Sequence, residues 1–249
     1  MRIKPSQSAQ RSLTTLYWKE ARKVLLEISK PVLAAADNTT PQGLKNKVDQ
    51  LLSPEKMEKY LNELWVKVGG KFAHDTERLI VKRKSLEEPR IDEWEEGFRM
   101  YAADRSKQIA KKIIKTQADY IKIAIDKVIN DAQVTGEAIS TISGAIKEEF
   151  AKDLIIMQRY EAERIARTEV IGASNKGSFD GAKNSGLDIK KGWLTSGLPG
   201  VRDTHLSYEL RGYINMEEEF APGLLHPGDP NGAPEEIINC RCTIVYEVD

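Results

Sequence analysis

One stretch limits the fold of this chain more than any other: the roughly forty residues from Asp92 to Asp131 contain no proline and, after Gly97, no glycine. Apolar residues recur in it at gaps of three, four, seven or eight, which is the spacing of one face of an α-helix. They are Trp94, Phe98, Tyr101, Ile109, Ile113, Tyr120, Ala124 and Val128. Since a helix rises about 1.5 Å per residue, this one would be roughly 60 Å long. The sequence therefore predicts a long central helix, as in a bundle or coiled coil.

The segments before this stretch also predict helices. Residues 9–35 carry an apolar stripe at helical spacing, and Pro31 is expected to kink or end that helix. Residues 34–43 are small, polar and turn-prone, so we interpret them as a linker. A second helix is expected over residues 53–81, where Ser-Pro-Glu supplies a cap and a first turn.

After the long helix the pattern changes in two steps. A short amphipathic helix is expected near residues 138–146, behind a cap at residues 135–137, and a longer helix over residues 153–182. Beyond it, short strands joined by proline- and glycine-rich loops are expected at Ile189, Gly192 to Leu194, Tyr213 to Ile214 and Cys240 to Val248. The predicted fold class is α+β: an elongated helical N-terminal region, residues 1–134, and a small mixed C-terminal module, residues 135–249.

The amino-acid composition limits the classes of partner that we expect for this chain. Lysine plus arginine and aspartate plus glutamate both number 38, so the formal net charge is zero, and no overall field favours nucleic acid or a membrane surface. No run approaches the roughly 18 apolar residues of a membrane span, and the first residues lack the apolar core of a secretory signal. Two cysteines form no disulfide framework. We therefore expect synthesis in a cytoplasm and no membrane partner.

One local run of positive charge lies on the long helix. It comprises Arg105, Lys107, Lys111, Lys112 and Lys115. This run is the best candidate for contact with DNA, because each phosphate contact needs a cation. The alternative is a solvated face of a helical bundle.

Most of the unusual residues lie in the last ninety or so positions. Arg167 and Glu169 are expected to reach the centre of the module and tie strands to a helix; the alternative is a surface cluster of charges. Arg202 and His205 lie three apart, as on one turn of helix. His226 opens a turn-rich loop, a place that suits function better than core. The predicted structural or binding centre comprises Arg167, Glu169, Trp193, Arg202, His205, His226, Asn239 and Arg241.

The two cysteines, Cys240 and Cys242, lie in a segment that is predicted to be the terminal strand. In an extended strand their side chains share a face roughly 6.5 Å apart, too far for a disulfide without a bend. Three interpretations remain open: two small buried hydrophobes, a tetrahedral zinc site with His205 and His226, or a nucleophile activated by a histidine. Against zinc, paired zinc-binding cysteines usually have two to four residues between them, and here there is one.

An ordered set of features resembles the phage Mu F-like minor head proteins, also called head morphogenesis proteins. The set is an Ile-Ala-Arg-Thr-Glu helix, a tryptophan strand, an Arg-x-x-His turn, a His-Pro loop and a terminal Asn-Cys-Arg-Cys strand. The matching positions are Ile165 to Glu169, Asn175, Gly177, Trp193, Arg202, His205, Phe220, Pro227 and Asn239 to Cys242. The resemblance covers roughly residues 135–249. This chain lacks the family's acidic residue near residues 195–200 and its Asp-Gly near residues 209–212.

The resemblance implies a minor component of a phage or prophage capsid, located in the virion near the portal and acting in head assembly or DNA delivery. Its implied partners are the portal protein, other capsid proteins and packaged double-stranded DNA. The family brings no established catalytic activity and no cofactor. The leading hypothesis is therefore a structural and interaction protein that is not an enzyme.

Enzymatic alternatives rest on the same module. An ADP-ribosyltransferase would need an arginine, then a Ser/Thr pair, then Glu-x-Glu, and Arg167, residues 195–196 and residues 217–219 supply that order. In such an enzyme the arginine should lie on a strand, whereas a helix is expected here. A metal-dependent nuclease is a second alternative, with these candidate residues: His205, His226 and Asn231. A zinc-stabilised module that binds nucleic acid is a third.

Overall fold

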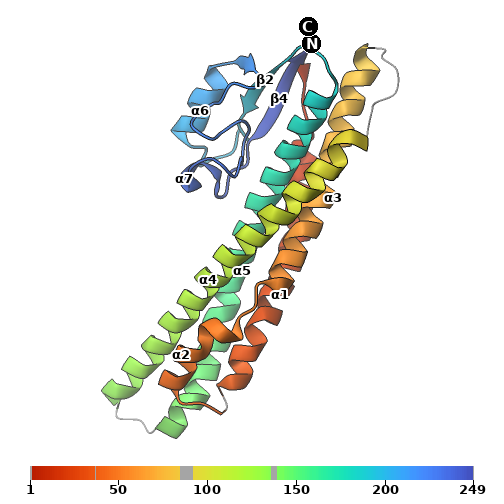
Figure 1. Cartoon of the computed structure of the whole chain (residues 1–249). Coiled ribbons are helices and arrows are strands. Elements are labelled where there is room, and N and C mark those ends of the chain that lie inside the picture. Colours follow the sequence, from red (N-terminus) through yellow and green to blue (C-terminus); the bar gives the residue numbers. More distant parts are fainter. Residues whose placement is uncertain (1, 37, 85–91, 136–138, 249) are drawn as a thin grey trace. The chain divides into compact units, whose positions relative to one another are not determined.

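The computed structural model describes residues 2–36, 38–84, 92–135 and 139–248 and confirms an α+β fold, in which helices dominate and a small antiparallel sheet gathers strands from both ends of the chain (Figure 1). The helices are α1 (Gln7–Ala35), α2 (Pro41–Leu51), α3 (Glu55–Lys84), α4 (Asp92–Thr135), α5 (Ile139–Asn184), α6 (Asp203–Leu210) and α7 (Pro234–Ile237). The strands are β1 (Arg2–Ile3), β2 (Ile189–Leu194), β3 (Tyr213–Asn215) and β4 (Thr243–Val248).

The long central helix is present as α4, which has 44 residues. Its buried face includes Phe98, Ile113 and Val128 of the predicted stripe, but the most deeply buried positions are shifted to Ala102, Ala110, Ile121 and Ile125. Pro31 lies inside α1 and does not end it, because the helix continues to Ala35. A proline removes one backbone hydrogen bond, and a helix with a well-packed face can tolerate that loss.

The expected linker at residues 34–43 contains the start of a helix that the sequence analysis missed. Thr40 is the N-cap of α2, and its hydroxyl accepts a hydrogen bond of 3.2 Å from the Gly43 amide. Pro41 occupies the first turn, where its missing N–H costs nothing. A threonine followed by a proline is thus a helix start here, although a proline within a polar segment also suggests a loop.

Helix α5 runs over 46 residues as one element, so the predicted break between residues 146 and 153 is wrong. No proline interrupts this segment. The cap expected at residues 136 and 137 lies outside the described residues. At the other end, Gly186 has a φ of 68° and its amide bonds to Lys183 O at 3.2 Å, which ends the helix as the sequence predicts.

Contacts divide the chain into two compact units, each assembled from separated segments. The first unit comprises Met1–Trp18, Asn62–Ala103 and Arg164–Asp249. The second comprises Lys19–Leu61 and Asp104–Glu163. The division of the chain at residues 134 and 135 stays a prediction. No helix in the described parts of the chain is long and apolar enough to cross a membrane.

The second unit is held by buried helix faces and by ion pairs between α2 and α4. Lys45 Nζ lies 2.6 Å from Asp126 Oδ1, and Lys122 Nζ lies 2.7 Å from Asp49 Oδ2. The candidate residues for contact with DNA are on the same helix: Lys107, Lys111, Lys112 and Lys115 are exposed and Arg105 is half-buried. Contact with DNA stays a prediction.

The sheet of the first unit joins the two ends of the chain. Its strand order is β1-β4-β2-β3, and all pairings are antiparallel. In the central pair, Trp193 lies opposite Ile244. At the edge, Ile3 lies opposite Tyr246, so the N and C termini lie close together (Figure 1). The sequence analysis missed β1, because two residues carry no periodicity.

Helices α3 and α5 approach each other closely in the first unit because glycines face the contact. A Cβ atom added at Gly177 would lie 2.0 Å from the carbonyl oxygen of Gly69. One added at Gly181 would lie 2.4 Å from the carbonyl oxygen of Ala73. The obstructing atoms are backbone, which cannot rotate away, so these positions need a residue without a side chain.

We predict that Gly177→Ala lowers the free energy of unfolding by about 1–3 kcal/mol, since the new methyl group forces the two helices apart. The matched control is Gly70→Ala on α3, where a Cβ meets nothing within 4 Å. Alanine favours helix over glycine, so this control should be neutral or stabilising by up to about 1 kcal/mol. Urea denaturation measures both changes. Equal stabilities of the two variants would contradict the close approach of the helices.

Candidate metal centre

The chain turns sharply between α7 and β4, and both cysteines lie in this turn. Asn239 has a φ of 59°, a left-handed conformation that asparagine tolerates better than most residues. β4 begins only at Thr243, so the prediction that Cys240 and Cys242 belong to the strand is wrong. The bend brings the two sulfur atoms within 4.8 Å of each other, closer than in an extended strand.

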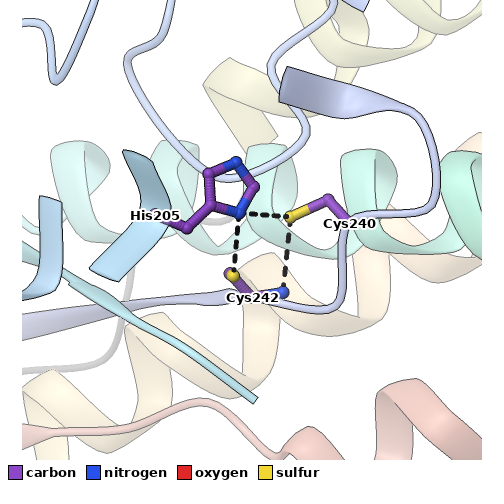
Figure 2. A group of neighbouring side chains, drawn as sticks. All are labelled: His205, Cys240 and Cys242. Carbon is purple, nitrogen blue, oxygen red and sulfur yellow. Dashed lines mark hydrogen bonds between the residues drawn. The ribbon is translucent and has the colours of Figure 1, made fainter. Parts of the chain in front are cut away.

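His205 faces both thiols from the first turn of α6 (Figure 2). Its Nδ1 atom lies 3.4 Å from Cys242 Sγ and 3.9 Å from Cys240 Sγ. The three side chains are buried, with at most 2% of each residue exposed, and both cysteines are free thiols. Three soft or borderline donor atoms therefore converge in a site with little access to water.

The other side of the imidazole is fixed by an acid and an aromatic ring. His205 Nε2 lies 2.9 Å from Glu236 Oε2, an ion-pair distance, although the two groups are not aligned for a hydrogen bond. The Thr204 hydroxyl donates to the same carboxylate oxygen at 3.0 Å. The Trp193 ring packs against the imidazole with 4.9 Å between centroids. These contacts turn Nδ1 towards the sulfurs.

The two thiols differ as acids. A hydrogen bond with Cys240 lowers the pKa of Cys242 to about 5; burial opposes this effect, and His205 adds to it. The same pairing and burial raise the pKa of Cys240 well above its ordinary value. Cys242 is therefore the stronger acid of the two thiols. A thiolate is the form that binds metals and attacks electrophiles.

A cavity of about 310 Å³ opens beside the cluster. Its lining includes all three cluster residues and the guanidinium side chains Arg167, Arg202 and Arg241. The first two arginines also hold the turn: Arg167 Nη1 donates to Asn239 Oδ1 at 3.0 Å, and Arg202 Nη2 donates to the carbonyl oxygen of residue 238 at 2.6 Å. Three arginines and three residues with donor atoms that suit a metal therefore line one cavity.

Most of the predicted centre does come together, and two of its members do not. The cavity or the cluster includes Arg167, Trp193, Arg202, His205, Asn239 and Arg241. Glu169 instead accepts a hydrogen bond of 2.9 Å from the Trp65 indole, on the side of α3. His226 packs against Phe179 and lies 3.7 Å from Asp229. Among the described residues, the group that could hold a metal contains His205 and excludes His226.

The position of His226 outside the cysteine cluster bears on the four-ligand zinc hypothesis and on the nuclease hypothesis. A zinc site with four protein ligands needs His226 beside the cysteines, and a nuclease built on both histidines needs them to face one substrate. The structure gives His226 its own partners, including a contact of 3.2 Å from Nδ1 to the Pro227 carbonyl oxygen, and burial lowers its pKa. Among the described residues, His226 therefore lies outside the group formed by His205 and the two cysteines.

The sequence analysis missed Glu236 and Lys191. Glu236 shows no signal, because it meets His205 only after the chain has folded. Lys191 lies in β2 as a fully buried cation. Its Nζ donates to the Met216 carbonyl oxygen at 2.7 Å and lies 5.0 Å from the ring centre of Phe179. Burial lowers the pKa of Lys191 to about 8, although nearby glutamates oppose the shift.

We predict that the free energy of unfolding rises with pH in the alkaline range because of Lys191. Its folded pKa of about 8 lies below the ordinary 10.5, so between these values the unfolded chain binds more protons and stability rises with pH. Lys191→Met removes this rise, whereas Lys190→Met, at an exposed neighbour, keeps it. Urea denaturation at about pH 7.5 and pH 9.5 measures the effect, and comparison between variants cancels the contribution of the tyrosines. Parallel pH profiles for the two variants would refute the assignment.

Comparison with known proteins gives one informative similarity. No protein-family model matches the chain, and no solved structure matches it. Among curated proteins, the similarity is to the class of ADP-ribosyltransferases. The relative is the NAD(+)–arginine ADP-ribosyltransferase EFV of Enterococcus faecalis, to which this chain is 29% identical over 149 residues.

The match covers 57% of this chain but 29% of the relative. The name describes the whole enterococcal protein, and most of that protein lies outside the matched region. Nevertheless, a curated relative is named as an enzyme, and this finding overturns the prediction that the chain is not an enzyme. It agrees with the enzymatic alternative that was derived from the order of Arg167, residues 195–196 and residues 217–219.

Proposed function

We propose that this chain is a minor structural protein of a phage or prophage head, which acts near the portal in head morphogenesis and DNA delivery. The observation that carries the proposal is the convergence of the residues that make up the Mu F-like resemblance. Arg167 bonds to Asn239, His205 faces both cysteines, and Trp193 packs on His205. Residues from separate segments thus meet in one buried cluster.

Two further positions of the resemblance act in the packing of the same unit. The Asn175 amide donates to the carbonyl oxygens of Pro227 and Cys242 and accepts from the Ile244 amide. Gly177 allows the backbone of α3 to approach α5. A resemblance made of residues with definite packing roles is unlike a chance match of surface residues, and this supports a shared scaffold.

The proposed partners are the portal protein and other capsid proteins, and the proposed location is the virion, after synthesis in the host cytoplasm. Packaged double-stranded DNA is a further partner. The exposed lysines of α4, at positions 107, 111, 112 and 115, support contact with phosphates. Because the formal net charge is zero, only this local group of lysines would attract DNA, and salt would weaken the attraction.

We predict that a tagged copy of this chain co-purifies with heads that contain the portal protein, because the module presents a fixed surface to a ring assembly. Heads from an induced prophage, analysed by mass spectrometry, test this expectation. Heads assembled without DNA are the control: retention there indicates a protein partner, and loss indicates DNA. Absence from all heads, and from mixtures with purified portal rings, would reject the proposal.

A specific observation favours a second candidate function, the transfer of ADP-ribose from NAD⁺ to arginine: the enterococcal relative is named for that activity. In this chain Arg167 and Ser196 line the same cavity. The three glutamates at 217–219 do not line it. Glu217 pairs with Lys183 at 2.8 Å, and the Glu219 carboxylate accepts from the Gly223 amide at 3.1 Å. The two proposals are compatible, since a virion protein can also carry an activity.

The second candidate predicts that the full chain transfers labelled ADP-ribose from NAD⁺ to agmatine, a small arginine mimic. Changing Glu217 and Glu219 together to glutamine should then lower the rate by at least about 100-fold, because a general base or a charge on the transition state is lost. Glu235→Gln, at an exposed acid of α7, is the matched control and should keep the activity. An inactive full chain would exclude this function and leave the head proposal intact.

A further inference from the structure

We propose that this chain binds one zinc ion through His205 Nδ1, Cys240 Sγ and Cys242 Sγ. The three donor atoms come from α6 and from the turn before β4, and all lie within 4.8 Å of one another (Figure 2). Imidazole nitrogen and thiolate sulfur are the donors that select zinc over the hard cations magnesium and calcium. The inference is independent of the proposed head function.

The two nitrogen–sulfur separations fit a tetrahedral ion. Zinc–sulfur bonds of about 2.3 Å and zinc–nitrogen bonds of about 2.0–2.1 Å place neighbouring nitrogen and sulfur ligands about 3.6 Å apart. The separations from His205 Nδ1 are 3.4 Å to Cys242 and 3.9 Å to Cys240. Each differs from the tetrahedral value by a few tenths of an ångström, which small side-chain rotations can supply.

The surroundings also suit a metal. Metal-bound histidines usually direct their second nitrogen to a carboxylate or carbonyl group, and His205 Nε2 lies 2.9 Å from Glu236 Oε2. The Cys242 amide approaches Cys240 Sγ at 3.4 Å, an interaction that stabilises negative sulfur. The buried Trp193 ring also packs against the His205 imidazole, with 4.9 Å between their centroids.

The simpler interpretation, two small buried hydrophobes, explains less. An apolar thiol needs no nitrogen beside it, whereas here both sulfurs face the same imidazole nitrogen. A cysteine–histidine nucleophile needs one thiol and leaves the second unexplained. A metal uses both thiols and the histidine at once.

In the part of the chain that the structure describes, three side chains supply ligands, so we place the fourth ligand in the neighbouring cavity. Three protein ligands leave one tetrahedral position, and all three border the cavity that Arg167, Arg202 and Arg241 line. Two thiolates neutralise the charge of Zn²⁺, so these arginines still give the cavity a positive field. Water or an anion in the cavity therefore completes the coordination.

The experiment uses the full chain, purified without chelators and without a metal-affinity resin. Elemental analysis should give one zinc per chain. After removal of the metal, titration with Co²⁺ should produce the absorption bands of tetrahedral cobalt–thiolate coordination, which zinc then abolishes. Chelation should also lower the melting temperature, because the ion joins α6 to the turn before β4.

Variants separate the ligands from their surroundings. Cys240→Ser, Cys242→Ser and His205→Asn should each abolish the cobalt–thiolate spectrum or change it. Glu236→Gln should keep the spectrum and weaken zinc affinity by about 10–100-fold, as expected for a residue that orients a ligand. His226→Asn is the matched control, a buried histidine outside the cluster, and should bind zinc as the parent does.

Two results would overturn the proposal. One is a folded parent chain that takes up less than one equivalent of zinc or cobalt in direct titration. The other is a loss of metal in His226→Asn as large as that in Cys240→Ser. A cysteine variant that fails to fold decides nothing alone, and the cobalt spectrum of the parent chain then gives the answer.

Discussion

The first unit depends on one buried amide. Asn175 Nδ2 donates to Pro227 O at 3.0 Å and to Cys242 O at 3.1 Å, and its Oδ1 accepts from the Ile244 amide at 3.0 Å. A single side chain of α5 thereby fixes the loop that contains His226 and the start of the last strand. A buried polar group that loses its partner costs about 1–3 kcal/mol. The position of the cysteine turn is thus decided by a helix that contributes no donor to the cluster.

The same helix explains why the first unit is made of distant segments. Along α5, Glu169 bonds to Trp65 of α3, and Ser174 accepts from Gln10 of α1. Ser178 bonds to both Thr76 of α3 and Tyr246 of β4. These residues are polar in sequence but buried in the fold, because each meets a partner on another element. An amphipathic pattern would place such residues at the surface. Glu169 was expected to tie a strand to the helix, and the structure shows it bonded to Trp65 of α3.

Sequence reasoning succeeded where local pattern decides the structure. The period of α4 and the glycine that ends α5 are local signals, and both elements are present. It failed where packing decides. Pro31 lies inside a helix, and β1 is a strand only because it pairs with β4. The bend at Asn239 brings together two cysteines that an extended strand would hold further apart. For the site, residue types identified His205 and both cysteines, but only the fold could exclude His226 and supply Glu236.

The two functional hypotheses, a head protein and an ADP-ribosyltransferase, rest on different residues of this chain. The head-protein resemblance runs through Asn175, Trp193, His205 and the cysteine turn, which hold the fold. The transferase order runs through Arg167, Ser196 and the glutamates at 217–219, and the cavity gathers only the first two. Residues that determine packing can be shared by proteins of unlike activity, since one fold can host many sites. The match covers 29% of the relative, so it supports a shared scaffold more directly than a shared activity. Any chemistry of this chain has to be argued from the cavity that its arginines and cysteines line.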